Sequence, residues 1–284
     1  MNTIIIRRMS PADLDFAAAR TVAEGWYTET LLEIAGFYAY DPQGCLIAEL
    51  EGKPVGMGFG MPYSGFGFLG ELIVLPEVRG QGIGQALMQQ IMSYLHACGC
   101  STVFLDGVLP AVPLYERLGF RKICRSLRFR GSLQGRQHAY VQPMRTDDLQ
   151  DVYTLDRATF GADRSFFLQR RLHFYPALCK VARSDGRLLG FCMGRIGHLG
   201  ISVGPWVASA EMESPHDLLD TLALEAPGAP LAVGCLVANE KAVETLRRLD
   251  FVENPTSPWR MACGELEHPG NVTQNFAIGS PAKG

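Results

Sequence analysis

The sequence contains an internal repeat, and this repeat limits the folds that the chain can adopt. Three stretches of the first half recur in the second half in the same order, with apolar residues at matching places: 4–15 with 139–150, 48–60 with 181–195, and 111–120 with 242–251. Matches that keep their order predict one fold that is used twice.

The 284 residues suffice for two domains that each bury a core. The polar stretch RFRGSLQGRQH at 128–138 has little apolar content, which is typical of a join between domains. We therefore expect a first domain over residues 1–131, a second domain over 138–265 and a C-terminal tail over 266–284.

Strand-like and helix-like patterns alternate within the first half, which predicts an α/β layer structure. Each domain should then have a mixed central sheet flanked by helices. The predicted elements are strands at 3–8, 66–75, 102–106 and 120–129, a hairpin at 44–62, helices at 11–23, 82–97 and 111–118, and a helix or loop at 28–39.

Composition and charge exclude several classes of protein. Lys+Arg 26 against Asp+Glu 29 give a net charge of -3, so nothing favours nucleic acid or a membrane as a partner. The start, MNTIIIRRMSPADLD, has too short an apolar run for a signal peptide, and no run reaches transmembrane length. The eight cysteines are scattered and lack the spacing of a zinc site, so we expect reduced thiols, no metal and a cytoplasmic location.

The stretch ELIVLPEVRGQGIGQALMQQIM at 71–92 contains the strongest functional signal. A helix that begins at Gly82 exposes its first N–H groups at the positive end of the helix dipole, which favours an anion. Glycines at 80, 82 and 84 allow a phosphate to approach the backbone, and Arg79 adds a permanent positive charge. The group that fits best is a pyrophosphate. The helix itself is predicted by apolar residues at every fourth position, with Gly99 just past its end: Ile83, Leu87, Ile91 and Leu95.

Two other kinds of phosphate loop fit less well. A P-loop requires Gly-Lys-Ser or Gly-Lys-Thr, whereas Gly84 is followed here by Gln85 and Ala86. A dinucleotide-binding fingerprint would need a small residue at position 85 and a tight turn after the strand. That fingerprint also requires an acidic residue at the end of the next strand, and Asp106 could fill this place. However, the spacing of the glycines argues against a dinucleotide-binding fingerprint.

The segment from Arg79 to Gly84 resembles the R-x-x-G-x-G loop of the GNAT superfamily of N-acetyltransferases, and AVPLYERLGF at 111–120 resembles the second signature of that family. The wider pattern is similar to tandem GNAT proteins with an intact N-terminal and a diverged C-terminal acetyltransferase domain. One departure is Val108, because family members often have an asparagine there. The resemblance implies acetyl-CoA as the cofactor, in contact with Leu72, Ile73, Val74, Arg79, Gly80, Gln81, Gly82, Ile83, Gly84, Gln85 and Tyr115.

Transfer of an acetyl group to an amine requires that the amine lose a proton. Glu71 and Asp106 stand on neighbouring predicted strands, where parallel strands separate around a ligand. Glu24, in the stretch AEGW with Trp26, could reach the mouth of the same cleft and contact the substrate. For each carboxylate the plain alternative is a surface or capping role.

The departing thiolate needs a proton or a hydrogen bond, and the resemblance places Tyr115 beside the cofactor sulfur. The structural alternative for Tyr115 is a core aromatic on an amphipathic helix. We expect direct attack on the bound thioester. A cysteine nucleophile, Cys100 or Cys124, is the rival, but neither has a histidine at a known motif spacing.

The second half should not bind acetyl-CoA. Val74 aligns near Val207, so the glycine loop corresponds to AEMESPHD at 210–217, which has two glutamates and a proline but no glycine. Carboxylates beside a pyrophosphate repel it. We therefore predict an acetyl-CoA-dependent N-acetyltransferase that acts through its first domain on an amine of a small molecule or peptide, as a monomer or homodimer. The alternative is an acyl-CoA sensor without turnover.

Overall fold

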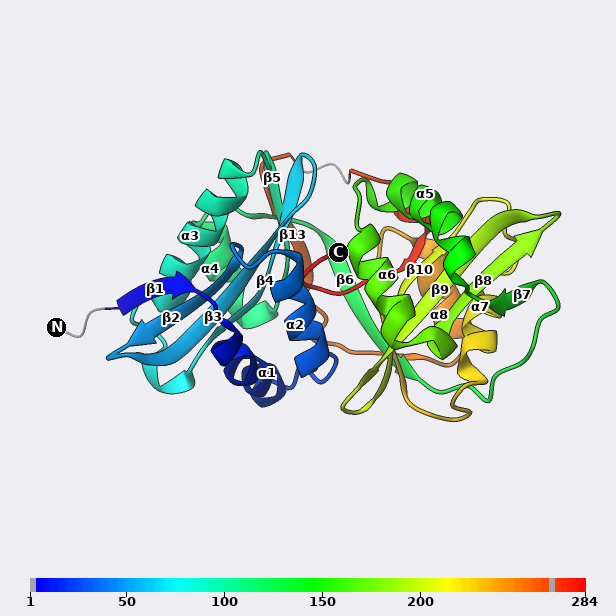
Figure 1. The fold of residues 1–284 in the computed structure, drawn as a ribbon, viewed down its shortest axis with the longest axis horizontal. Helices are drawn as coiled ribbons and strands as arrows, with labels where there is room; N and C mark the ends of the chain where they lie inside the picture. Colours follow the sequence, from blue (N-terminus) through cyan, green and yellow to red (C-terminus); the bar gives the residue numbers. More distant parts are fainter. Residues whose placement is uncertain (1–3, 266–268) are drawn as a thin grey trace. The chain divides into compact units, whose positions relative to one another are not determined.

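The structure is a computed structural model that describes residues 4–265 and 269–284, and the chain forms two compact units (Figure 1). What we call the N-unit contains the chain as far as Lys122, a segment that begins at Met261, and Lys283. What we call the C-unit contains the remainder: Ile123–Arg260, a segment that ends at Ala282, and Gly284.

The compact units are interleaved in sequence, whereas the predicted domain ranges, 1–131 and 138–265, are each continuous. The difference at the first boundary arises from strand β6 (Arg121–Gly131), predicted as the last strand of the first domain. From Ser126 to Gly131 it pairs antiparallel with β11 (Leu231–Leu236), in the C-unit. Long-range pairing of this kind leaves no mark on local sequence pattern. The first residues of the predicted tail, 266–268, lie outside the described residues.

The N-unit has a central sheet in the order β1-β2-β3-β4-β5, antiparallel except for the parallel pair β4–β5 (Figure 1). The predicted α/β architecture with a mixed sheet is confirmed, and the stretch 28–39, predicted as helix or loop, contains a helix. The strands are β1 (Ile4–Arg8), β2 (Cys45–Leu50), β3 (Lys53–Pro62), β4 (Phe66–Val74) and β5 (Thr102–Gly107), and the helices are α1 (Leu14–Ala23), α2 (Leu31–Tyr40), α3 (Ile83–Ala97) and α4 (Val112–Arg117).

Helix α3 packs closely on one face of this sheet because glycines remove side chains from the strands beneath it. A Cβ atom on Gly60 would lie 2.7 Å from Ile91, and one on Gly67 would lie 2.8 Å from Leu95. The predicted apolar face of α3 is confirmed, since its four residues are each at most 1% exposed. On the opposite face, the ring of Phe37 in α2 lies 5.5 Å from that of Phe59 in β3.

The C-unit repeats this arrangement with a sheet in the order β7-β8-β9-β10-β11-β6, to which β12 and β14 add at β6 and β10. Strands β10 and β11 run parallel, whereas β7–β8, β8–β9, β9–β10 and β6–β11 are antiparallel pairs. Its elements are β7 (Val141–Pro143), α5 (Leu149–Phe160), α6 (Ser165–Phe174), β8 (Cys179–Ser184), β9 (Arg187–Gly197), β10 (Gly200–Ala208), α7 (His216–Ala223), α8 (Glu240–Arg248), β12 (Val252–Glu253) and β14 (Asn275–Ala277), with β13 (Trp259–Cys263) crossing the boundary between the units.

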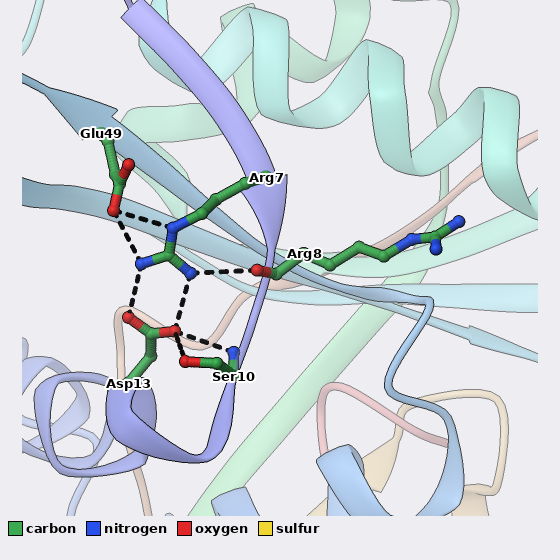
Figure 2. A network of polar contacts seen from close by, with 5 residues as sticks. All are labelled: Arg7, Arg8, Ser10, Asp13 and Glu49. Carbon is green, nitrogen blue, oxygen red and sulfur yellow. Dashed lines mark hydrogen bonds and ion pairs between the residues drawn. The ribbon is translucent and has the colours of Figure 1, made fainter. Parts of the chain in front are cut away.

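The start of α1 is fixed by a charged network (Figure 2). Arg7 donates from two guanidinium nitrogens to the two carboxylate oxygens of Asp13, both at 2.7 Å, and its Nε donates to Glu49 at 2.7 Å. Asp13 also accepts from the N–H of Ser10 at 2.8 Å. The hydrogen bond from Arg7 is the main reason that the pKa of Asp13 falls to about 2. The second repeat has a similar network. Asp148 at the start of α5 accepts hydrogen bonds from the guanidinium group of Arg183 and from the backbone N–H of Arg145.

We predict that Arg7→Met lowers the free energy of unfolding at pH 7 by roughly 2 kcal/mol, the value that the depressed pKa of Asp13 implies. The folded-state pKa lies below the unfolded value, so this contribution is present above about pH 4 and disappears as pH falls through about 2. Urea unfolding of both proteins across this range measures the effect. Arg8→Met is the matched control, since Arg8 is exposed and its side chain points away from the network (Figure 2). Equal free energies of unfolding for Arg7→Met and Arg8→Met at pH 7 would contradict a stabilising role of the contact between Arg7 and Asp13.

Candidate functional site

The sheet of the N-unit opens along β4. This strand pairs with β5 only at Phe66, Gly67 and Phe68, although it continues to Val74. On its other side β4 remains paired with β3 as far as Val74. The second half of β4 therefore presents one edge of backbone N–H and C=O groups that no described strand covers, and an extended ligand can add to such an edge.

A bulge lies where β4 separates from β5. Between the paired residues Gly70 and Ile73, the strand carries two residues, Glu71 and Leu72, opposite one residue of β3. Glu71 has a φ of 51°, a left-handed conformation that is strained for a residue with a Cβ atom. Bulges of this kind re-aim side chains beside active sites. The side chain that this bulge re-aims is a carboxylate, and Glu71 is only 5% exposed.

The predicted phosphate loop follows directly. Gly80 and Gly82 have φ values of 79° and 82°, which only glycine adopts without strain, and α3 begins at the next residue, Ile83. Among residues 4–265 and 269–284, none accepts a hydrogen bond from the N–H groups of 80–85. These donors at the positive end of α3 are therefore available to an anion, as the sequence predicts.

Arg79 is held beside this loop by two contacts. Its Nε donates to the carbonyl of Val74 at 2.8 Å, and its Nη2 forms an ion pair with Glu24. Glu24 thus lies beside the loop, on the exposed turn after α1. Trp26 is half-buried in the same turn, where its backbone N–H donates to the carbonyl of Thr21. An anion bound at the loop would compete with Glu24 for Arg79.

Tyr115 lies on α4, and its ring packs against the backbone of β5. A Cβ atom on Gly107 would lie 2.9 Å from this ring, so the close approach depends on glycine. Asp106, the preceding residue of β5, is half-buried. Burial raises the pKa of Tyr115 to about 12, so its hydroxyl is protonated at neutral pH and can donate. At Gly84, a Cβ atom would lie 3.7 Å from Val74 and 3.8 Å from Leu114, so the loop, the end of β4 and α4 lie together.

The two cysteines considered as nucleophiles do not fit this site. Cys100 is 2% exposed, and burial raises the pKa of its thiol, which keeps it in the unreactive form. Cys124 belongs to the C-unit. None of the eight cysteines, all of which lie among the described residues, forms a disulfide.

The C-unit has the same bulge in the same place. In β10 the bulge falls at Gly204, at the position that Glu71 has in β4. Three residues further on, Val207 corresponds to Val74, in agreement with the sequence alignment. The predicted counterpart of the glycine loop then leads into α7, which begins only after Pro215.

A strand of the same chain fills the corresponding opening in the C-unit. Strand β10 pairs with β11 only as far as Val203, and beyond that point β14 pairs with Trp206 and Val207. On the other side, Ile278 donates its N–H to the carbonyl of Gly234 in β11 at 2.8 Å. The edge that stays open in the N-unit is therefore closed here by an internal strand.

Buried contacts hold β14 in this position. Asn239, 2% exposed, donates to the carbonyls of Thr273 and Asn275, both at 3.0 Å. The rings of Trp206 and Phe276 lie 5.1 Å apart. Asn239 stands just before the stretch 242–251, at the place that Val108 has before 111–120 in the N-unit. The C-unit therefore has an asparagine at this position, and its side chain binds backbone carbonyls of the same chain.

One group of side chains in the C-unit has the composition of a metal site: His138, Asp217 and Asp220 lie with ligand atoms within 4.8 Å of one another. However, Nδ1 of His138 lies 3.2 Å from Asp217 and Nε2 lies 3.5 Å from Asp220. Tyr140 also donates to Asp217. His138 therefore contacts both carboxylates directly, and its Nε2 forms no hydrogen bond within the described part of the chain.

Comparison with known proteins agrees with this geometry. Residues 12–120 match the Acetyltransferase (GNAT) family, and residues 152–277 match the Acetyltransferase (GNAT) domain. The chain is 34% identical to an uncharacterized N-acetyltransferase from Methanocaldococcus jannaschii over 42% of its own length and 78% of that protein. It is 32% identical to thialysine N-epsilon-acetyltransferase from Sus scrofa over 37% of its own length and 74% of that protein.

The chain therefore belongs to the GNAT family of acetyltransferases, with two GNAT domains in tandem, as predicted. It covers only 42% of glucosamine 6-phosphate N-acetyltransferase from Trypanosoma brucei brucei, with 37% identity over 22% of its own length. A crystal structure of a proposed acetyltransferase from Pyrococcus horikoshii has the same fold, with a TM-score of 0.83, 21% identity and coverage of 99% of this chain and 96% of that one. Among the described residues, no helix is both long enough and apolar enough to cross a membrane.

The sequence pointed to the loop, the edge of β4 and Tyr115, and the structure brings these elements together in the N-unit. It did not point to β14, to Glu33 on α2 or to Lys283. Glu33 is 7% exposed and Lys283 is 5% exposed, although charged residues are rarely buried. Nothing in their local sequence distinguishes them from surface residues.

We predict that Glu24→Gln strengthens the binding of inorganic pyrophosphate to the protein by about two- to fivefold, because a competing carboxylate leaves Arg79. Isothermal titration at low ionic strength measures this affinity. Glu77→Gln is the matched control, since Glu77 is an exposed acid beside the same loop. An equal gain in both variants would indicate a general charge effect and would contradict a specific role of Glu24.

Proposed function

We propose that the N-unit transfers the acetyl group of acetyl-CoA directly to an amine. The observation that carries this proposal is the conjunction of an open β4 edge, an anion-binding loop at its end and a protonated tyrosine on the adjoining helix. Bound acetyl-CoA would supply an activated thioester, and the residues of the chain bind it, orient it and move protons.

The binding of acetyl-CoA would use the backbone more than side chains. The pyrophosphate would accept hydrogen bonds from the N–H groups of residues 80–85, with Arg79 as a cation at the rim. The pantetheine arm would lie along Leu72, Ile73 and Val74 and pair with them as an added strand does. The glycines, the free donors and the uncovered edge all fit such a ligand.

Deprotonation of the acceptor is the first chemical demand on the protein. An alkylamine titrates about 3 units above neutrality, which corresponds to roughly 4 kcal/mol of barrier. Glu71 is our candidate for the base, directly or through a water, because it lies at the strained bulge beside the open edge of β4 and its carboxylate is buried. Asp106 on β5 is the second candidate.

Stabilisation of the departing thiolate is the second demand, and we assign it to Tyr115. As the C–S bond breaks and the C–N bond forms, the hydroxyl of Tyr115 would donate a hydrogen bond to the sulfur, which keeps the electron pair of the C–S bond. Burial of the ring raises the pKa of this hydroxyl to about 12, so it stays protonated as a donor. The departing thiolate would take its proton from solvent, and the second proton that the amine loses would pass to the base. A sensor without turnover would not need this residue, and we therefore favour the enzyme.

The acceptor in this proposal is a small-molecule or peptide amine. Two relatives support an amine, because their names describe N-acetylation, one of them at the ε-nitrogen of thialysine. The sensor alternative predicts that the protein binds acetyl-CoA but releases no thiol with any amine. A screen of amines for thiol release in the presence of acetyl-CoA separates the two functions.

We predict that Tyr115→Phe lowers kcat by more than tenfold while the affinity for acetyl-CoA stays within twofold, because only the hydroxyl is removed. Thiol release measures the rate, and calorimetric titration measures the affinity. Tyr153→Phe in the C-unit is the matched control and should retain the wild-type rate. A wild-type rate in Tyr115→Phe would return this residue to a purely structural role.

We also predict one acetyl-CoA per chain, because β14 closes the opening of the C-unit and its loop lacks glycine. Calorimetric titration measures the stoichiometry. Arg79→Glu should abolish binding, whereas Arg187→Glu, an exposed arginine of the C-unit, should leave it unchanged. Two sites per chain, or binding that survives Arg79→Glu, would refute the asymmetry between the units.

A further inference from the structure

Lys283 is an unusual member of the N-unit, because its ammonium group is buried against α2. Its Nζ lies 3.0 Å from Oε2 of Glu33 and 4.3 Å from the ring centroid of Phe37. Its backbone carbonyl accepts a hydrogen bond from the hydroxyl of Tyr63 at 2.9 Å. The side chains of Lys283 and Glu33 are only 6% and 8% exposed.

This environment has the chemistry of a receptor for an alkylammonium group. Glu33 and Phe37 stand four residues apart on α2, so they share one face of the helix. A buried carboxylate is costly unless a cation compensates it, and an aromatic face adds a further attraction for a cation. A neutral group of the same shape would gain neither the ion pair with Glu33 nor the attraction to the ring of Phe37.

This face of α2 lies over the part of the sheet where the proposed reaction would occur. The ring of Phe37 lies 5.5 Å from that of Phe59 in β3. Phe59 is paired with Gly70 of β4, and the next residue of β4 is Glu71 at the bulge. The ammonium group of Lys283 is therefore bound on the helix whose Phe37 packs on β3 beside the bulge, in the same compact unit.

We propose that Glu33 and Phe37 form the ammonium-binding part of the acceptor site and that Lys283 fills it as an internal occupant. This inference rests on the proposed function and narrows it, because the acceptor is then a primary alkylammonium that must displace Lys283. The free protein is held back by its own lysine until the acceptor competes for Glu33.

The first test measures binding without acetyl-CoA. Lys283→Ala removes three carbons and the nitrogen, and n-propylammonium chloride restores those atoms. We expect n-propylammonium to raise the thermal unfolding midpoint of Lys283→Ala more than sodium chloride of equal concentration or 1-propanol does. The gain should disappear in Lys283→Ala/Glu33→Gln and be absent in Lys241→Ala, an exposed-lysine control.

The second test measures transfer with n-propylamine as the acceptor. We expect kcat/KM for thiol release to be at least tenfold higher in Lys283→Ala than in the wild type and in Lys241→Ala. Lys283→Ser is made in parallel, so that the outcome does not depend on the folding of one variant. If both truncations unfold, n-propylammonium should restore folding and 1-propanol should not.

The outcomes separate this inference from the proposed function. Ammonium-selective stabilisation without acetyl transfer would support the subsite and refute the proposed function. Acetyl transfer by the wild type, with no ammonium selectivity in either truncation, would refute the subsite and leave the proposed function standing. Truncations that fold, show no selectivity and keep the wild-type rate would make Lys283 a structural anchor of its segment.

Discussion

The separation of β4 from β5 after Phe68 is the constraint on which the proposed site depends. Paired strands satisfy their backbone groups, so an open edge inside a sheet is costly unless a ligand or another strand completes it. The N-unit holds the edge open by packing. Glycines in β3 and β4 allow α3 to press against one face, Phe37 of α2 covers the other, and the bulge at Glu71 turns the strand away from β5.

The two units meet this constraint in different ways. Both contain a bulge at corresponding positions and a parallel strand pair that ends beside it. In the C-unit the edge is completed by β14, and Gly204 is required there because a Cβ atom would lie 1.9 Å from the carbonyl oxygen of Ile278. In the C-unit an internal strand therefore occupies the place that the proposed ligand would take in the N-unit, while the architecture of the sheet is kept. Loss of the glycine loop is consistent with this replacement.

Local patterns predicted the features that depend on neighbouring residues. The spacing of Ile83, Leu87, Ile91 and Leu95 defined α3, and the glycines around it defined the loop, because both follow from the geometry of one helix and its first turn. Repeats revealed the second GNAT domain. Tyr115 was identified by resemblance, and its burial and raised pKa could be known only from the packing of α4 on β5.

Features that depend on distant residues were not predictable. The pairing of β6 with β11, the insertion of β14 and the ion pair of Lys283 with Glu33 join residues separated by about 70 to 250 positions, and no periodicity marks them. The contact of Glu24 shows the same limit. The sequence suggested that Glu24 could reach the mouth of the cleft, but its ion pair with Arg79 joins residues 55 positions apart and could be known only from the structure.

The end of the chain contacts both units: β14 pairs with β10 in the C-unit, and Lys283 contacts Glu33 in the N-unit. These two sets of contacts differ in strength. In the C-unit the end of the chain is fixed by backbone pairing, by Asn239 and by the ring of Trp206, and Arg195 donates to the carbonyl of Gly279 at 2.9 Å. In the N-unit it is represented by Lys283, whose Nζ lies 3.0 Å from Glu33 and whose carbonyl accepts a hydrogen bond from Tyr63. Many buried contacts must break together to release β14, whereas exchange of one ammonium group for another at Glu33 replaces an ion pair by an equivalent ion pair. The exchange that we propose in the N-unit therefore leaves the pairing of β14 with β10 intact.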